Sequence, residues 1–486
     1  MIEKESIQVV WLKKDLRLHD HAAFHYACQQ SLKTLIIYLF EPNIINNPDY
    51  DQRHYQFIVE SIHDMNSQLE KHQHQVNVLN FDALDAFKMI QEKFQIKLLI
   101  SHVETGNFVS FKRDLLIKDW CAQQQVPWIE LKQHPVFRVL KERSNYNFRK
   151  NQFYGESQKE ADFSLLKTVN LGSENQFVSK SGNQHQRQKG GETEGLKILE
   201  TFIETRHKGY IKQISKPSES SIHCSRLSPY LTFGCLSEKY VMNRCEQILN
   251  TGMVNKRDFE GFLTRLKWRS HFVQKLESAF IYEFQNINPA FDKLDRKENK
   301  EWLERWQSGN TGYPLVDACM RSLNQTGWIN FRMRAMLVSL LCHTLWQPWQ
   351  KGAHHLARMF LDYEPGIHYP QIQMQASTTG VHTLRIYNPV KQSYDQDPDS
   401  EFISQWIPEL EGIPKKLKHE PWKLNPLEIS LYQLSNHKYP QPMVDFEKQA
   451  RHAKQKISEI LKSEDCQLHA KEILVKLSNP KMEENE

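Results

Sequence analysis

Residues 224–230 read CSRLSPY, and the assignment of a fold to this chain depends more on this stretch than on any other. Ser225 and Ser228 offer hydroxyl groups just before Pro229, where the pattern predicts the start of a helix. Hydroxyls and free backbone N–H groups at a helix start can hold an anion without a metal ion. Most such stretches are simple helix caps, so the motif has to be weighed together with the rest of the chain.

Upstream of this motif, short apolar runs alternate with amphipathic stretches. The apolar runs predict strands at 7–12, 34–40, 76–79, 96–100 and 126–129, and the stretches between them predict helices at 21–30, 55–71, 83–94 and 111–124. Strands that alternate with helices predict an α/β, Rossmann-like domain with a mostly parallel sheet. Such a sheet commonly binds a nucleotide-like ligand at the carboxyl ends of its strands, but no G-x-G-x-x-G motif fixes one here.

Beyond residue 134 the pattern changes twice. Residues 135–195 are polar and irregular, with Asn, Gln, Ser and Lys crowding 168–191, and they predict an interdomain linker. Helical periodicity then dominates, at 194–206, 259–276, 313–326 and 331–345. The sequence therefore predicts four parts: an α/β domain (1–134), the linker (135–195), an all-α domain (196–443) and a charged, solvated helical tail (444–486).

The overall composition is that of a large globular protein. The chain has 486 residues, 39% of them hydrophobic, which is enough for a sizeable core. Its eight cysteines show no C-x-x-C spacing, so we expect no metal site and no disulfide framework. No apolar run reaches the roughly 20 residues needed to cross a bilayer, and residues 1–6 carry charge in place of a signal region. We therefore expect a soluble, cytoplasmic protein without a membrane partner.

The net charge of +5 is concentrated in one window of the chain. Residues 261–360 hold 14 Lys or Arg against 8 Asp or Glu, and no acidic residue occurs between Asp317 and Asp362. Basic side chains interleaved with tryptophans suit a phosphate-bearing partner. A helical core with arginines at its edges accounts for the composition equally well. The basic residues in question are Arg321, Arg332, Arg334, Lys351 and Arg358.

Further motifs accompany residues 224–230 in a recognisable order. They are TGYPLVDA with Met320-Arg321 (311–321), TGW with Arg332 and Arg334 (326–334), AST (376–378), RIYNP (385–389), FIxxW (402–406) and YPQP (439–442). At the N-terminal end, WLxxDLRLxD occupies residues 11–20. Together with SRLSPYL (225–231) and Gly234, these motifs resemble the DNA photolyase/cryptochrome superfamily from residue 7 to residue 445. The resemblance implies an N-terminal antenna domain followed by an all-α, FAD-binding domain.

The resemblance also implies which residues hold FAD. Arg334 should pair with Asp362 beside the flavin ring, where the carboxylate orients the guanidinium and the cation favours an anionic reduced flavin. An ordinary structural ion pair is the alternative for these two residues. Glu364 stands where the family usually has Asp near the flavin or ribose. The other positions carried over are expected near the phosphates or on the next helix: Tyr210, Cys224, Ser225, Arg226, Leu227, Ser228, Trp268 and Arg269.

Three residues, Trp268, Trp349 and His368, are expected to take part in the chemistry. His368 replaces an Asn that photolyases commonly place near flavin N5. An imidazole there could donate to N5 or take up a proton near neutral pH, and a merely structural histidine is the alternative. Trp349 matches the middle of the family's usual relay of three tryptophans, whereas the inner and outer places hold Ile372 and Arg296. Another route could use other aromatic residues, which are more often part of a core: Trp302, Trp328, Trp346, Tyr369 and Tyr387.

The pocket that would receive a DNA lesion is altered. Positions that hold Glu, Asn and Trp in cyclobutane-dimer photolyases read Arg265, Phe331 and Met374, while the stacking Trp268 is kept. Losing the Glu removes an acceptor for the thymine edge, and Arg265 adds a cation that could bind phosphate or a different lesion. Residues 354–358 (HHLAR) are out of register with the histidine motif of (6-4) photolyases, so we interpret that likeness as chance.

These observations predict an FAD-dependent, blue-light-driven DNA photolyase that repairs ultraviolet-induced pyrimidine lesions by electron transfer from reduced flavin. A cryptochrome-like photoreceptor without repair activity is the alternative, and a third possibility is a flavoprotein that has kept the fold but lost repair. Damaged DNA is the expected partner, replaced by a signalling partner if the protein is a photoreceptor. We expect a monomer, and the first domain allows a second, antenna chromophore of folate or deazaflavin type.

Overall fold

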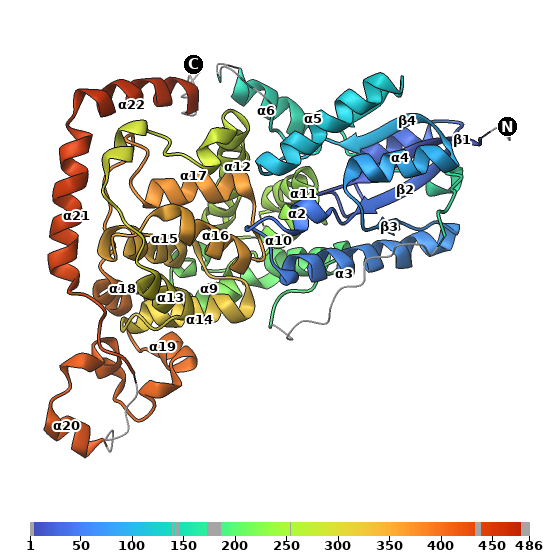
Figure 1. Cartoon of the computed structure of the whole chain (residues 1–486). Helices are drawn as coiled ribbons and strands as arrows, with labels where there is room; N and C mark the ends of the chain where they lie inside the picture. The colour runs from blue at the N-terminus through green and yellow to red at the C-terminus, as the bar shows by residue number, and fades with distance from the viewer. Residues whose placement is uncertain are drawn as a thin grey trace, which may run out of the picture.

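The computed structural model describes residues 4–138, 140, 143, 145–172, 186–252, 254–432 and 439–477. Residues 173–185 of the predicted linker and 478–486 of the predicted tail lie outside the described residues. Within the described part, an α/β unit and a larger helical unit lie side by side, and two tail helices run along the far side of the helical unit (Figure 1). No helix in this part is both long and apolar enough to cross a membrane.

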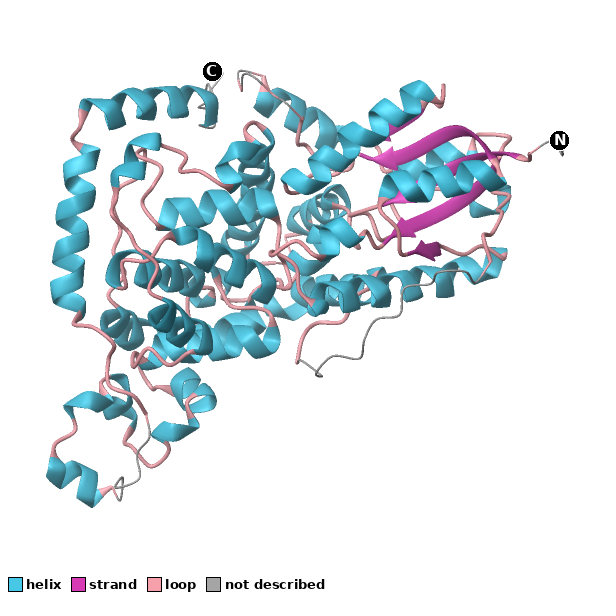
Figure 2. Ribbon diagram, in the orientation of Figure 1, coloured by secondary structure: helices cyan, strands magenta, loops and turns pink. Residues whose placement is uncertain are grey.

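The N-terminal unit is built around a five-stranded parallel sheet in the order β3-β2-β1-β4-β5 (Figure 2). The strands are β1 (Ser6–Leu12), β2 (Lys33–Leu39), β3 (Asn77–Leu79), β4 (Gln95–His102) and β5 (Trp128–Leu131). The helices between them are α1 (Ala22–Cys28), α2 (Pro42–Ile45), α3 (Gln52–Leu69), η1 (Glu70–His72), α4 (Ala83–Lys93) and α5 (Phe108–Gln123). The predicted strands and helices are confirmed, with their ends shifted by a few residues.

Helices cover both faces of this sheet. Val10 of β1 packs in one cluster with Phe24 of α1, and its neighbour Val9 packs in another with Phe87 of α4. Because successive side chains of a strand point to opposite faces, a strand that is apolar at every position has to be covered on both sides. Strands β2 and β3 lie on one side of β1, and the later strands β4 and β5 lie on its other side. Doubly wound sheets bind their ligands at such a reversal, which falls here between β1 and β4.

The rest of the described chain is helical. Its elements before the tail are α7 (Glu192–Thr201), the π-helix η3 (Phe202–Arg206), α8 (Tyr210–Gln213), α9 (Pro217–His223), α10 (Ser228–Thr232), α11 (Glu238–Asn250), α12 (Lys256–Glu277), η4 (Phe280–Glu283), η5 (Pro289–Lys293), α13 (Lys300–Ser308), α14 (Pro314–Thr326), α15 (Phe331–Ser339), the π-helix η6 (Leu340–Thr344), α16 (Trp349–Met359), α17 (Pro365–Gln375), α18 (Pro389–Gln396), α19 (Glu401–Trp406), η7 (Pro408–Leu410), η8 (Lys415–His419), η9 (Pro421–Lys423) and α20 (Pro426–Leu431). The helices predicted from periodicity are confirmed.

Two of these helices, α12 and α17, approach each other at a glycine. A Cβ atom added to Gly366 would lie 2.6 Å from the Cα atom of Val273, which is too close for any larger side chain. This contact brings the helix that carries Trp268 against the helix that carries His368. Close backbone packing therefore holds Trp268, predicted at the lesion pocket, and His368, predicted beside the flavin, on adjacent helices.

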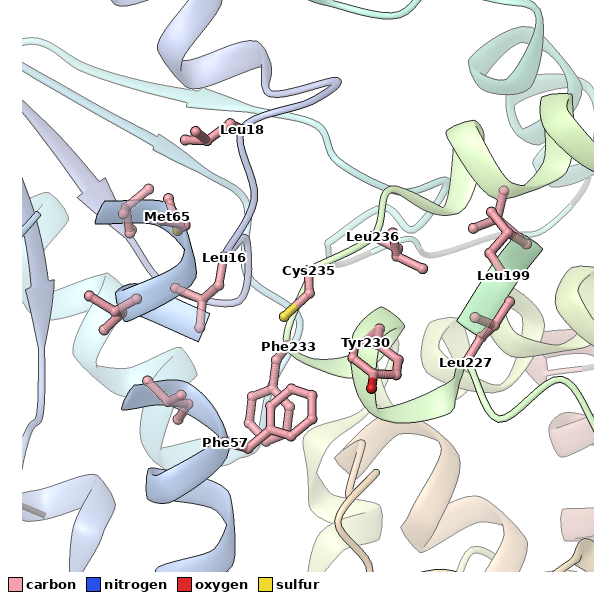
Figure 3. Packing of buried hydrophobic residues seen from close by; sticks show 14 of the residues in the cluster. Leu16, Leu18, Phe57, Met65, Leu199, Leu227, Tyr230, Phe233, Cys235 and Leu236 are labelled. Carbon is pink, nitrogen blue, oxygen red and sulfur yellow. The ribbon is translucent and has the colours of Figure 1, made fainter. Parts of the chain in front are cut away.

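The α/β unit and the helical unit share one hydrophobic core (Figure 3). Leu16 and Phe57 of the first unit pack with Tyr230 and Phe233 of the second, and the rings of Phe57 and Phe233 lie 5.0 Å apart between centroids. The backbone N–H of Leu16 also donates to the carbonyl oxygen of Phe233 at 3.1 Å. A shared apolar core of this kind fixes the orientation of one unit against the other.

The prediction that residues 135–195 are irregular is wrong in part, because they contain α6 (Tyr146–Gly155) and the 3-10 turn η2 (Phe163–Leu165). Tyr146 and Phe153 of α6 are buried. The hydroxyl of Tyr154 donates to the carboxylate of Glu238 on α11. Packing against the helical unit, and not local helix propensity, therefore accounts for α6.

The prediction of a solvated tail is also wrong for the described residues. Its two helices are α21 (Phe446–Leu461) and α22 (Glu464–Leu477). Ala453 and Ile457 are fully buried in a cluster with Phe291, and Ile473 and Leu477 are buried in the next cluster. Both pairs are spaced four residues apart, so each charged helix carries one narrow apolar stripe that faces the core.

Candidate functional site

Hydrogen bonds from Arg206 fix the backbone of the CSRLSPY loop (224–230). Its Nη1 donates to the carbonyl oxygen of Cys224 at 2.6 Å, and its Nη2 donates to that of Ser225 at 3.2 Å. Arg226 has a left-handed backbone with φ 61°, and its guanidinium carbon lies 4.0 Å from the centre of the Trp328 ring. Burial lowers the pKa of Arg226 to about 10, so the side chain remains a cation at neutral pH. Arg226 and Trp328 belong to two separate sequence motifs. The fold brings them into direct contact, with the guanidinium over the indole ring.

Arg334 and Asp362 form the predicted pair. Nη1 and Nη2 of Arg334 donate to Oδ1 and Oδ2 of Asp362 at 3.0 and 2.9 Å, an arrangement that fixes the guanidinium plane. Burial alone would raise the pKa of Asp362, but Arg334 and a hydrogen bond with the Ser228 side chain hold it below its usual value. The loop and the ion pair therefore meet at Asp362.

Glu364 is buried at the start of α17 with one oxygen unpaired. Its Oε2 lies 3.6 Å from Nη2 of Arg269 and 3.5 Å from Nζ of Lys14. Its Oε1 has no hydrogen-bond partner in the described parts of the chain. A buried carboxylate oxygen without a donor is costly, and a ribose hydroxyl or a ring N–H would satisfy it. The polar groups at this end of the site therefore fit FAD.

His368 lies on α17 among aromatic side chains. Its Nε2 acts as a donor, since it contacts the carbonyl oxygen of Ala353 at 2.9 Å, and this leaves Nδ1 as an acceptor. The rings of Tyr363 and Tyr369 lie 5.2 and 5.3 Å from the His368 ring between centroids. Burial lowers the pKa of His368 to about 4. The ring is therefore uncharged near neutral pH and presents Nδ1 as an acceptor, and its role beside flavin N5 stays a prediction.

Replacing His368 with Asn is expected to flatten the acid side of the stability profile. The pKa of His368 is about 4 in the folded chain and 6.5 when exposed, so the unfolded chain binds the extra proton between these values. The free energy of unfolding therefore falls as the pH drops through this window, and His368 contributes up to about 1.4 kcal/mol per pH unit to the slope. Urea unfolding across the window measures the slope, and an unchanged slope in His368→Asn would contradict a buried neutral ring.

Two half-exposed aromatic side chains mark the predicted lesion pocket. Trp268 on α12 is 49% exposed, and Phe331 at the start of α15 is 54% exposed. The guanidinium carbon of Arg265 lies 4.3 Å from the centre of the Trp268 indole. Met374, near the end of α17, is partly buried. Large aromatic side chains exposed to this degree are typical of a binding surface.

Trp349 is buried and has one aromatic contact that the usual relay does not use. Its indole N–H donates to Asn286 at 2.8 Å, and its ring meets the Tyr369 ring at 6.3 Å between centroids. Ile372 is buried, and Arg296 donates to the carbonyl oxygen of Ala376 at 3.0 Å. Neither an aliphatic side chain nor a guanidinium can be oxidised in place of an indole, so the usual three-residue route is interrupted at both ends.

Three of the residues predicted near the phosphates, Tyr210, Cys224 and Leu227, offer a phosphate no charged side chain. Tyr210 is buried, with its ring 5.9 and 6.1 Å from those of Phe202 and Phe262. Burial raises the pKa of Cys224 to about 12, so this side chain is a neutral thiol. Leu227 is buried as well, so any contact of this residue with a phosphate has to come from its backbone.

Much of the basic stretch after residue 317 is engaged within the protein. Arg321 donates to Glu409 at 2.8 Å, and Arg358 donates to the carbonyl oxygen of Pro48 at 2.9 Å. With Arg334 held by Asp362 and Nζ of Lys351 4.0 Å from a carboxylate oxygen of Glu298, four of the five basic side chains serve intramolecular contacts. The helical-core interpretation of this composition is therefore the better one.

Sequence reasoning missed Asp49, Arg206 and the role of His354. Asp49 is buried in the α/β unit and accepts hydrogen bonds from Tyr363 and Tyr369. His354, from the stretch interpreted as chance, contacts the same carboxylate. These partners are more than 300 residues from Asp49 in sequence, so no local pattern could indicate them.

A parallel doubly wound sheet, a shared core and an arginine–carboxylate pair beside the CSRLSPY loop are typical of a two-domain, nucleotide-binding protein. Residues 8–162 match the family described as DNA photolyase, and residues 262–459 match the FAD binding domain of DNA photolyase. The chain belongs to the DNA photolyase/cryptochrome superfamily, and FAD is the cofactor of its helical domain.

Relatives carry the names of both branches of this family. A deoxyribodipyrimidine photo-lyase of Alkalihalophilus pseudofirmus is 26% identical, over 93% of this chain and 98% of the relative. A cryptochrome DASH of Gloeobacter violaceus is 27% identical, over 90% of this chain and 93% of the relative. The crystal structure of a cryptochrome from Synechocystis has the same fold, with a TM-score of 0.84 and 22% identity over 94% of this chain and 100% of the other.

Proposed function

We propose that the protein is an FAD-dependent, blue-light-driven DNA photolyase that repairs ultraviolet-induced pyrimidine lesions. One observation supports this most: a half-exposed Trp268 adjoins Arg269, which lies 3.6 Å from the buried Glu364 of the flavin site. An exposed indole beside the cofactor site offers a surface on which an extruded base can stack. FAD, when bound, supplies light absorption and one-electron transfer.

The residues around this surface would have separate roles. Arg334 and Asp362 would hold the flavin in a fixed orientation, and Glu364 would accept a hydrogen bond from it. Trp268 would stack on the extruded lesion, and the half-exposed Phe331 would add apolar surface that excludes water. Arg265, held over the indole, supplies a cation for a DNA phosphate. Extrusion costs a few kcal/mol and least for a damaged base, so recognition and extrusion favour the same substrate.

The deciding experiment combines lesion chemistry with light. Purified protein with bound, reduced flavin is given oligonucleotides that contain either cyclobutane dimers or (6-4) products, and is then illuminated with blue light. Loss of at least one lesion type in the light and not in the dark is the expected result. Lesions of both types that persist in the light would contradict repair.

Trp268→Ala is expected to weaken binding of damaged duplex by about tenfold or more, because stacking of one base on an aromatic ring contributes roughly 1–3 kcal/mol. Affinity for the same duplex without a lesion should be unchanged, because phosphate contacts carry that binding. Fluorescence anisotropy at one fixed salt concentration measures both affinities. Trp268→Phe, which keeps an aromatic face, serves as the matched control. Equal losses for damaged and undamaged DNA would show that Trp268 does not contact the lesion.

A cryptochrome-like photoreceptor is the second candidate, and the docked tail favours it. The ring of His452 on α21 lies 4.9 Å from that of Trp346, and the guanidinium of Arg296 lies 5.0 Å from the same indole. A tail that contacts Trp346, the indole next to the outer relay position Arg296, could respond to flavin reduction. Hydrogen exchange of residues 446–477 in light and in darkness tests this candidate, and identical protection in both conditions would contradict it.

A further inference from the structure

A buried cluster of hydrogen-bonding side chains joins the two units beside His368. Asp49, in the loop between α2 and α3, is 1% exposed. Its Oδ2 accepts from the hydroxyls of Tyr363 and Tyr369 at 2.5 and 2.7 Å, and its Oδ1 lies 2.7 Å from Nδ1 of His354. Three side chains of the helical unit therefore converge on one carboxylate of the α/β unit.

The cluster runs from the core to the surface. Tyr363 and Tyr369 are buried, whereas 32% of the His354 side chain is exposed. Burial alone would raise the pKa of Asp49, but its bonds with His354 and the two phenols hold it below the usual value. Burial, together with the charge of Asp49, raises the pKa values of both tyrosines well above the ordinary value. The resting cluster is therefore a carboxylate base with two neutral phenols, and an imidazole at its surface end.

Tyr369 differs from Tyr363 in its contact with Trp349. The rings of Tyr369 and Trp349 meet edge to face, 6.3 Å apart between centroids and with their planes at 73°. Ile372 and Arg296 stand at the other relay positions, and among the residues that the structure describes Tyr369 is the oxidisable side chain in ring contact with Trp349. The ring of Tyr369 therefore contacts an oxidisable indole, that of Trp349, while its hydroxyl donates to a carboxylate base, Asp49.

We propose that Tyr369 is a redox-active tyrosine that gives an electron to oxidised Trp349 and its proton to Asp49. The inference rests on the proposed light-driven function: repair needs reduced flavin, and photoexcited oxidised FAD would be the oxidant that takes one electron from Trp349 while the reduced flavin is formed. The indole cation radical gains one electron and becomes neutral. The O–H bond of Tyr369 breaks, the proton moves to Oδ2 of Asp49, and a neutral tyrosyl radical and a carboxylic acid remain.

Proton transfer is what makes this step favourable. An oxidised phenol is a far stronger acid than a neutral one, so its formation requires a base within hydrogen-bond reach. Asp49 meets this requirement at 2.7 Å. His354, bound to the other carboxylate oxygen and partly exposed, connects the cluster to solvent. Asp49 acts here through Tyr369 and is a positioning and proton-accepting residue.

The test is flash photolysis of the FAD-loaded protein, with electron paramagnetic resonance as the readout. Ring-deuterated tyrosine, incorporated during expression, identifies a tyrosyl radical by the narrowing of its spectrum. The wild type and Tyr363→Phe should both form this radical. Tyr369→Phe should lack it, and oxidised Trp349 should then persist at least about tenfold longer. Asp49→Asn keeps a hydrogen-bond acceptor but cannot take the proton, so it should lower the radical yield while leaving Tyr369 in place.

Tyr363→Phe is the matched control, because each Tyr→Phe change removes one hydrogen bond to the same carboxylate oxygen. Equal effects of the two changes, or a tyrosyl radical that survives in Tyr369→Phe, would overturn the inference. A Trp349→Phe variant with unaltered flavin photoreduction would overturn it by removing its oxidant. Tyrosyl radical formation in a protein that repairs no lesion would support the inference and contradict repair.

Discussion

Asp362→Ala is expected to purify largely without FAD and to be less stable than the wild type by about 2–3 kcal/mol. The change removes both carboxylate acceptors of the Arg334 guanidinium and leaves the cation with the carbonyl oxygen of Ile329 but without its counter-ion, in a site where Asp362 itself is almost fully buried. Arg334 is 23% exposed, so water compensates part of the loss and the cost lies below that of a fully buried pair. It also removes the acceptor that ties Ser228 of the anion-binding loop to the ion pair.

The ratio of flavin to protein absorbance measures cofactor occupancy, and urea unfolding of the two apoproteins measures stability without the added effect of bound FAD. Glu409→Ala is the matched control, because it removes another arginine–carboxylate contact, that of Arg321, at a distance from the flavin site. This control should keep its FAD. Full occupancy in Asp362→Ala would refute the role of the pair in holding the flavin.

Gly234→Ala is expected to destabilise the protein by at least about 3 kcal/mol, through overpacking and backbone strain together. A Cβ atom at Gly234 would lie 2.1 Å from the carbonyl oxygen of Lys14 and 2.7 Å from the Cα atom of Asp15, and φ is 66°. These are backbone atoms of the segment that follows β1, so no side chain can rotate away to make room. The chain can relieve the clash only by moving the α/β unit from the helical unit.

Gly252→Ala is the control for the backbone strain alone. Its φ of 71° is close to that of Gly234, but no atom lies within 4 Å of the added Cβ atom. It should therefore cost only about 1 kcal/mol, the penalty of a left-handed conformation. Urea unfolding of both variants compares the two costs. Equal losses of stability would show that the contact between the units tolerates a methyl group at Gly234.

The sheet could be predicted from the sequence because its signals are local. Val9 and Val10 face opposite layers, and an apolar run of this kind, followed by an amphipathic helix, is the pattern of a parallel strand. The flavin residues could be predicted for a different reason. Ser228 and Arg334 lie in motifs whose order along the chain resembles a known family, and Asp362 is assigned by its position between two of these motifs.

The state of His368 could not be predicted, because it depends on neighbours supplied by folding. Its pKa of about 4 is due first to burial, and its tautomer is set by the carbonyl oxygen of Ala353 on another helix. The helix α6 and the apolar stripes of α21 and α22 were missed for the same reason. Their buried residues face surfaces that are distant in sequence, so their local composition reads as polar.

The sequence by itself determined the α/β unit, the helical unit and the motif expected to bind FAD, because short-range periodicity and ordered motifs encode them. Only the tertiary structure decided what the CSRLSPY loop meets: Arg206 behind it, Trp328 beside it and Asp362 at its end. The tertiary structure likewise decided that the Asp49 carboxylate accepts hydrogen bonds from Tyr363 and Tyr369 of the helical unit and contacts His354 there. Hydrogen-bond partners and burial follow from contacts between segments hundreds of residues apart, and such contacts exist only once the chain has folded.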